Sequence, residues 1–208
     1  MPVIAVDGPA ASGKGTIARA LARELGLPHM DTGLLYRAVA LNLWRWGGDP
    51  SSEFEALRAA GEHGFDPDDP ELRSEPVSRI ASSISAYPAV RAALRERQQE
   101  FAGQPGGAVL DGRDIGTVIA PDADVKLFVT ASPEVRAQRR VRELLQRGMT
   151  AHYEDVLLDI RARDERDSNR EVAPLKQASD ALLLDTSDLD AEQAIAEALR
   201  LVRQKVEA

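Results

Sequence analysis

Residues 8–16, "GPAASGKGT", follow the apolar run "VIAV" and lead into "IARALAREL". The apolar run predicts a buried strand and the following segment has the spacing of a helix, so the glycine-rich stretch joins a strand to a helix. Gly8 and Gly13 allow the backbone to curl until several N–H groups point into one concavity. The positive N-terminal end of a helix that begins near Lys14 adds to the attraction for anions. The stretch therefore predicts a loop that binds a polyphosphate.

Within this loop, Lys14 is expected to reach the β- and γ-phosphates, and the hydroxyl of Thr16 to hold Mg²⁺ directly or through water. Gly15 follows Lys14, where the general phosphate-loop motif has Ser or Thr. A glycine-rich turn without a ligand is the alternative interpretation, but the strand before the loop and the helix after it favour the phosphate site. The residues expected to contact the triphosphate are Gly8, Ala10, Ala11, Ser12, Gly13, Lys14, Gly15 and Thr16.

Composition narrows the class of protein. The chain has 208 residues, 43% of them apolar, with 26 basic and 34 acidic residues, a net charge of -8 and no cysteine. This is enough for one globular domain, and its negative charge should repel nucleic acid and acidic membranes. A bound phosphate must therefore meet a local basic site. Without cysteine there are no disulfides or thiolate metal sites, but the redox compartment stays open. No basic segment precedes a long apolar one at the N-terminus and no apolar run has membrane-spanning length, so we expect a cytoplasmic protein.

Short apolar runs alternate with helix-period segments, which predicts an α/β fold with a mostly parallel, five-stranded sheet. Strands are expected at residues 3–7, 28–31, 108–111, 125–130 and 181–185. Helices are expected at residues 14–25, 34–46, 77–101, 133–147, 153–167 and 191–206. Residues 47–76 break this rhythm with glycine, proline and acidic residues, which predicts an irregular excursion or a small lobe.

Five stretches, in this order, resemble bacterial cytidylate kinases over nearly the whole chain: "DGPAASGKGT", "DTGLLYRA", "AYPAVRAALRERQ", "LDGRDIGTVIAPDA" and "RDERDSNREVAPL". "GKGT" is the form found in nucleoside monophosphate kinases. The resemblance implies one P-loop kinase domain over residues 1–208, with helices flanking the sheet, a short lid at 139–153 and a reduced NMP-binding lobe at 47–76. Family members often have a longer lobe with a small antiparallel sheet, and this sequence departs from them there.

The stretch "VLDGRD" ends an apolar strand in acid, where the carboxyl edge of a parallel sheet meets ligands. Asp111 is thus a candidate partner of Mg²⁺ through water, and a turn-capping aspartate is the alternative. The resemblance implies that Arg113 contacts the acceptor phosphate and that Asp114 contacts cytosine. His29 has no ligand spacing with another histidine and is assigned no role.

Arg163, Asp167 and Arg170 stand at i, i+4 and i+7, so they share one face if the helix continues. A surface ion-pair ladder is the alternative interpretation. The resemblance implies that Arg163 and Asp167 hold the sugar and that Arg170 holds the acceptor phosphate. It further implies phosphate contacts for Thr32 and Arg37 and base contacts for Ser82 and Arg91.

Three further arginines, Arg136, Arg139 and Arg140, precede the polar turn "QRGMTAH" at helical spacing. They resemble the lid that closes over ATP, where arginines spread charge from the transferring phosphoryl group. A basic solvent-exposed face is the alternative, and the spacing leaves open which arginine turns inward; we choose Arg139. The predicted catalytic set is then Lys14, Arg113, Arg139 and Arg170.

Phosphoryl transfer needs alignment and charge neutralisation more than a strong base, because the acceptor phosphate is already an anionic nucleophile. Together with the resemblance, this predicts a monomeric enzyme that transfers the γ-phosphate of Mg-ATP to CMP and dCMP, with neither nucleic acid nor membrane as a partner. One alternative is a kinase for AMP, UMP or shikimate, which would not need the base-reading set of Ser82, Arg91 and Asp114. Another is a nucleotide switch, which should carry an "NKxD" element that this sequence lacks.

Overall fold

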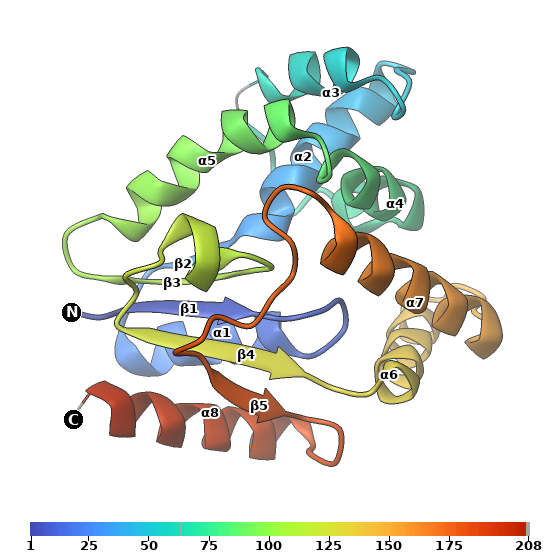
Figure 1. Cartoon of the computed structure of the whole chain (residues 1–208). Coiled ribbons are helices and arrows are strands. Elements are labelled where there is room, and N and C mark those ends of the chain that lie inside the picture. The colour runs from blue at the N-terminus through green and yellow to red at the C-terminus, as the bar shows by residue number, and fades with distance from the viewer. Residues whose placement is uncertain (63, 207–208) are drawn as a thin grey trace. The chain divides into compact units, whose positions relative to one another are not determined.

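The computed structural model describes residues 1–62 and 64–206. The chain divides into two compact units (Figure 1). The first, here called the sheet unit, comprises Met1–Met30 and Ala102–Ala208, and the second, the helical unit, comprises Asp31–Phe101. Among the described residues no helix is both long and apolar enough to cross a bilayer.

The sheet has five strands in the order β2-β3-β1-β4-β5, as predicted in number. The pairs β1–β3, β1–β4 and β4–β5 are parallel. The strands are β1 (Val3–Asp7), β2 (His29–Asp31), β3 (Ala108–Gly112), β4 (Val125–Thr130) and β5 (Leu182–Asp185). Their bounds confirm the predicted ranges to within one residue.

The core of the sheet unit lies on one face of β1. Ile4 and Val6 are fully buried there, against α1 (Lys14–Leu25) and α8 (Ala191–Val206), both at their predicted bounds. Because side chains alternate along a strand, Asp7 belongs to the opposite face. It is the last residue of β1, so its carboxyl group lies at the carboxyl end of the central strand.

The sheet unit contains three further helical segments. They are α6 (Pro133–Gln146), α7 (Tyr153–Asn169) and a short π-helix, η2 (Ile115–Ile119). The condition for a shared face of Arg163, Asp167 and Arg170 is not met, because α7 ends at Asn169 and Arg170 is extended, with φ -64° and ψ 142°. Its Nε donates to the carbonyl of Ala173 at 2.5 Å, and this bond holds the chain in a turn that leaves the helix.

The helical unit contains α2 (Thr32–Arg45), α3 (Glu53–Ala60), η1 (Pro70–Arg73), α4 (Glu75–Ile84) and α5 (Pro88–Ala102), which reaches the unit boundary. The single helix predicted over residues 77–101 is wrong, because the chain forms α4 and α5 instead. The cause is Pro88, whose ring disfavours helical backbone at the residue before it.

The expectation of irregular chain over residues 47–76 is also wrong in part, since α3 and the 3₁₀ turn η1 lie there. The side chain of Ser52 caps α3 by accepting from the backbone N–H of Glu55 at 3.3 Å. Ser52 and Glu55 stand at the S-x-x-E spacing of a helix start, a signal that the glycine and proline content of the segment obscured. No strand is described in residues 47–62 or 64–76.

Candidate functional site

The glycine-rich loop has the tight geometry that its sequence predicts. A Cβ on Gly8 would lie 2.0 Å from the carbonyl oxygen of Val129, so only glycine fits this approach of the loop to β4. Gly13 is left-handed, with φ 89°, and caps α1. Ala11 is also left-handed, with φ 59°, an uncommon conformation for a residue with a side chain. Such backbone strain is typical of a loop built around a ligand.

Side chains in the loop add donors to this backbone. Ser12 is fully buried, and its Oγ has no hydrogen-bond partner within the described part of the chain. The ammonium group of Lys14 donates to the carbonyl of Pro9 at 3.3 Å, so this side chain folds back along the loop. With the N-terminus of α1 beside them, these groups form a site suited to an anion.

Asp111, at the carboxyl end of β3, faces the start of α1. Its Oδ2 lies 3.5 Å from the position that a Cβ on Gly15 would take, next to Thr16. One carboxylate and one hydroxyl fit Mg²⁺, which keeps several waters and takes further oxygens from phosphates. Residues 1–62 and 64–206 contain no group of three His, Cys, Asp or Glu side chains able to hold a metal by themselves. The donor set therefore fits a metal that arrives with a nucleotide.

The other oxygen of Asp111 is held by a residue that the sequence did not point to. Nε2 of His29 lies 2.7 Å from Oδ1 of Asp111, and the His29 side chain is largely buried. His29 begins β2, which lies beside β3 in the sheet. Since neither histidine spacing nor a motif marks this pair, only the strand order could have revealed it.

Arginines and carboxylates from three parts of the sheet unit meet in one cluster. Nε of Arg113 donates to Oδ2 of Asp167 at 2.8 Å, and Nε of Arg163 lies 4.0 Å from the same oxygen. Arg170 places its Nη2 3.7 Å from Oδ1 of Asp114. Burial acts to raise the pKa of Asp167, but the charges of Arg113 and Arg163 outweigh it, so this pKa lies below its usual value. Asp167 is therefore ionised at neutral pH and holds Arg113 in place.

The three candidate arginines of α6 have different partners. Arg136 is buried and bonds to Asp164 of α7 and to the carbonyl of Ala10 in the phosphate loop. Arg139 donates to Oγ1 and to the carbonyl of Thr186, at 2.9 and 2.6 Å. Arg140 donates to Glu143 at 2.8 Å on its own helix.

Sequence reasoning missed the bond between Arg136 and the loop, and it missed Thr186, whose hydroxyl lies 3.1 Å from the carbonyl of Ser12. The role assigned to Arg139 in phosphoryl transfer stays a prediction.

In the helical unit, the structure gives partners to two of the predicted arginines. Arg37 donates to Oγ of Ser78 at 2.6 Å and to the carbonyl of Leu72 at 3.2 Å. Arg91 is 4% exposed and lies over the ring of Tyr36, 5.7 Å from its centroid. The other two predicted residues of this unit, Thr32 and Ser82, are also buried.

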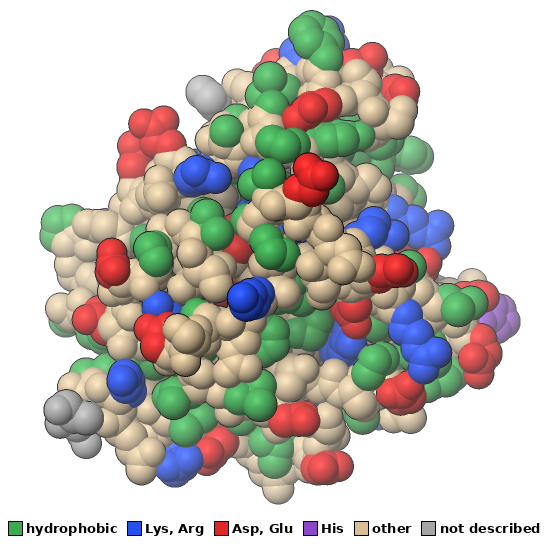
Figure 2. All heavy atoms as spheres, in the orientation of Figure 1, with side chains coloured by type: hydrophobic (Ala, Val, Ile, Leu, Met, Phe, Trp, Pro, Cys, Tyr) green, Lys and Arg blue, Asp and Glu red, His purple; other side chains and the backbone are tan. Residues whose placement is uncertain are grey.

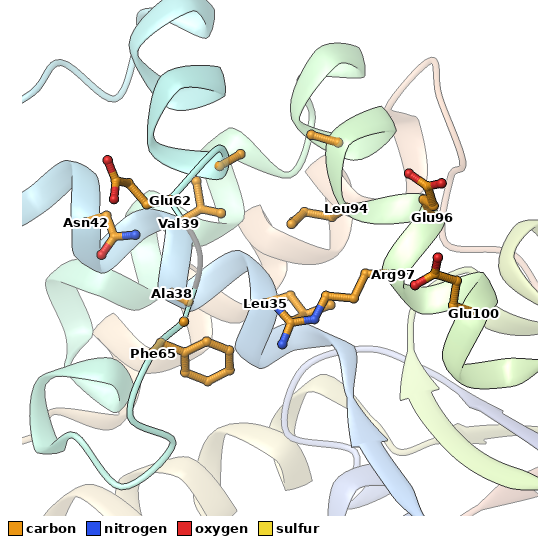
Figure 3. Close-up of a pocket in the computed structure, with 13 residues that line it drawn as sticks. Leu35, Ala38, Val39, Asn42, Glu62, Phe65, Leu94, Glu96, Arg97 and Glu100 are labelled. Carbon is orange, nitrogen blue, oxygen red and sulfur yellow. The ribbon is translucent and has the colours of Figure 1, made fainter. Parts of the chain in front are cut away.

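A cavity of about 390 Å³ lies within the helical unit, among α2, α5 and residues 60–62 and 64–65 (Figure 3). Leu35, Val39 and Leu94 contribute its apolar lining, and Glu62 and Arg97 lie among the polar residues around it. None of the predicted site residues is among the residues that line this cavity.

The electrostatic character of the visible face is mixed. Figure 2 shows Lys and Arg side chains interspersed with Asp and Glu side chains over α6 and α7, at the right of the view. The cluster of Arg113, Arg163 and Arg170 is a local basic feature of a chain whose net charge is -8.

The parallel sheet with a glycine-rich loop between β1 and α1 defines a P-loop kinase fold. A crystal structure of shikimate kinase from Bacteroides thetaiotaomicron shares this fold, with a TM-score of 0.53 at 16% identity over 100% of both chains. The family model for cytidylate kinase matches residues 4–204. The chain is 59% identical to a cytidylate kinase of Xanthobacter autotrophicus and 56% identical to one of Paramagnetospirillum magneticum. Each alignment covers 98% of this chain and 98% of the relative. The chain therefore belongs to the cytidylate kinase family and is an enzyme of the kinase class.

Proposed function

We propose that the chain transfers the γ-phosphate of Mg-ATP to CMP and dCMP, forming CDP or dCDP and ADP. The names of its relatives support CMP as the acceptor. The single observation that carries the assignment to this site is the cluster of Arg113, Arg163 and Arg170 around Asp167 and Asp114. In a chain of net charge -8, it provides the local basic site that an anionic acceptor requires.

The phosphate loop is the proposed site of the donor. Backbone N–H groups at the start of α1 bind the phosphates, and Lys14 neutralises charge between the β- and γ-phosphates. Thr16 and Asp111 would hold Mg²⁺, with water between the ion and Asp111. The ion supplies charge neutralisation at the phosphate oxygens. His29 keeps one oxygen of Asp111 occupied, which leaves Oδ2 directed to the loop.

The arginine cluster is the proposed site of the acceptor. Arg113 and Arg170 bind its phosphate, Asp114 accepts a hydrogen bond from the amine of cytosine, and Arg163 with Asp167 binds the sugar. Because the bond to Asp167 holds the guanidinium of Arg113 in place, little reorganisation is needed when the phosphate binds. For the helical unit by itself, we propose phosphate contacts from Thr32 and Arg37 and base contacts from Ser82 and Arg91.

Catalysis then depends on alignment of the two phosphates, and Arg139 is proposed to stabilise the charge on the group in transfer. Residues 139–153 are the proposed lid and residues 47–76 the proposed NMP-side lobe, within one functional domain that acts as a monomer in the cytoplasm. In the structure Arg139 bonds to Thr186, so it must exchange these bonds to reach the phosphoryl group.

The test is a measurement of ADP formation from Mg-ATP with CMP, dCMP, UMP, AMP and shikimate as acceptors. CMP and dCMP should give the highest kcat/KM, and the variant Lys14→Ala should lower the rate by about 10²-fold or more with every acceptor. A preference for AMP or shikimate would refute the proposed acceptor, and ADP formation that needs no acceptor would favour a nucleotide switch.

A further inference from the structure

Asp7 belongs to the motif "DGPAASGKGT" but receives no role in the reaction described above. It is 4% exposed, and both of its carboxylate oxygens accept a backbone hydrogen bond. Oδ1 accepts from the N–H of Ile115 at 2.8 Å, and Oδ2 accepts from the N–H of Gly116 at 2.7 Å. These two donors follow directly after Asp114, the residue proposed to read the base.

The two N–H groups are the first of the π-helix η2, where a helix has no internal acceptors for its own donors. An aspartate in the position of Asp114, at the start of a helix, commonly uses its side chain as the cap. Here the side chain of Asp114 makes no capping bond. Asp7 caps the helix from the neighbouring strand, and the carboxylate of Asp114 lies 3.7 Å from Arg170 instead.

The fit between the two segments is close. A Cβ on Gly116 would lie 3.1 Å from Cδ of Lys126 and 3.4 Å from Oδ2 of Asp7. The absence of a side chain at this position therefore allows the N–H of Gly116 to approach the carboxylate. Tight packing on both sides means that a small change at Asp7 moves the backbone of residues 115 and 116.

Burial of this carboxylate is unfavourable. The pKa of Asp7 is raised to about 6, because desolvation and, to a smaller extent, the charge of Asp114 outweigh the two backbone hydrogen bonds and the charge of Lys14, which lower it. A neutral side chain would cap only one N–H group, or none, but it would avoid the cost of a buried charge. A carboxylate at position 7 can accept from the N–H groups of Ile115 and Gly116 at the same time, which a neutral side chain cannot do as well.

We propose that Asp7 is a positioning residue, which holds residues 113–116 so that Asp114 faces the cytosine base and Arg113 faces the acceptor phosphate. This inference rests on the proposed function, in particular on the reading of the base by Asp114. Asp7 itself touches neither substrate. Its effect is therefore expected on the binding and choice of the acceptor, with no effect on the binding of the donor.

The variant Asp7→Asn tests this. Its amide keeps one acceptor and places an N–H₂ group against the remaining backbone N–H, so one of the two bonds is lost. The Kd and KM of CMP should rise about tenfold, and the ratio of kcat/KM for CMP to that for UMP should fall by a similar factor. The Kd of ADP, measured by calorimetry in the same buffer, should remain within about twofold of wild type.

Asp124→Asn is the matched control. Oδ2 of Asp124 accepts from the N–H of Val3 at 2.7 Å, so this carboxylate also holds backbone, but at the other end of β1. The control should lower the melting temperature and leave the ratio of CMP to UMP unchanged. Asp114→Ala is measured in parallel, because it tests the reading of the base directly.

A folded Asp7→Asn variant with the wild-type ratio overturns the positioning role. If Asp114→Ala loses discrimination in that same experiment, the proposed function survives and only the role of Asp7 fails. If Asp114→Ala keeps the wild-type ratio, the reading of the base is wrong, and the inference about Asp7 fails with it. Should Asp7→Asn not fold, Asp7→Ser is measured in its place, and failure of both to fold overturns the proposal in favour of a structural role.

Discussion

Removal of the carboxylate of Asp164 should destabilise the protein, because it leaves the buried guanidinium of Arg136 without its counter-charge. Arg136 is 3% exposed, and in the Asp164→Ala variant its remaining bonds run to the carbonyls of Ala131 and Ala10. Loss of one partner from a fully buried ion pair costs about 3–5 kcal/mol. Asp164 is 25% exposed, so water reaches the site and a cost of about 2–3 kcal/mol is expected. For a chain of this length, that is a fall of about 4–12 °C in the melting temperature.

A second ion pair between the same two helices supplies the control. Arg161 of α7 lies 2.7 Å from Glu134 of α6, and both side chains are about half exposed. Because solvent screens this pair, Glu134→Ala should melt at nearly the wild-type temperature. The assay is thermal unfolding followed by circular dichroism, together with the KM of ATP, which should rise for Asp164→Ala because Arg136 also bonds the phosphate loop. Equal melting temperatures for the two variants would refute the argument.

Three further outcomes are expected. Lys14→Ala should lower kcat by about 10²-fold or more with an unchanged melting temperature, and near-normal turnover of the folded variant would remove the phosphate-loop assignment. Amide hydrogen exchange in residues 139–153 and in the described part of 47–76 should slow when a bisubstrate analogue binds, because water must be kept from the γ-phosphate; unchanged exchange in both would contradict a lid. Asp7 binds its proton more tightly in the folded chain, with a pKa raised from 3.8 to about 6, so its contribution to stability is largest at low pH and falls as pH rises from 3.8 to about 6. The loss is about 3 kcal/mol, and urea titrations across this range should show it in the wild type but not in Asp7→Asn, so identical pH slopes would refute it.

The strands were predictable because buried parallel strands are nearly continuous apolar runs, as in "VIAV" and around Val125–Thr130. Pro88 is a local signal for the break between α4 and α5, but the long helical pattern on both sides of it outweighs this signal in the sequence. At α3, the glycines and prolines of the segment outweighed the capping signal of Ser52 and Glu55. Local signals thus fixed most elements, and errors arose where two local signals competed.

The site was predictable only where a motif or a helical face brought residues together. Asp167 and Arg113 form the bond that holds the cluster, and both were selected from the sequence. Arg170 lies 3.7 Å from Asp114 although α7 ends before it, so the helical spacing does not account for its place in the cluster, and its predicted contact with the acceptor phosphate stays a prediction. The bond of Asp7 to Ile115 spans 108 residues and ends on a backbone N–H group, which carries no side-chain signal.

These contacts suggest how an acidic chain can attract an anionic acceptor. Three carboxylates of the sheet unit have oxygens that are engaged by the protein itself: Asp7 by two backbone N–H groups, Asp111 by His29, and Asp167 by Arg113. Their oxygens are occupied by donors, so their repulsion of a phosphate is reduced, while the arginines that they hold keep an orientation. The loss of conformational entropy that orders these side chains then occurs during folding and not during catalysis. The ordered arginines can stabilise the charge of the phosphate in the transition state without further rearrangement. Arg200 of α8 is solvent-exposed and pairs with Glu197 on its own helix, so its removal provides a comparison. A substitution that removes the partner of one of these carboxylates should weaken binding of the acceptor more than removal of Arg200 does.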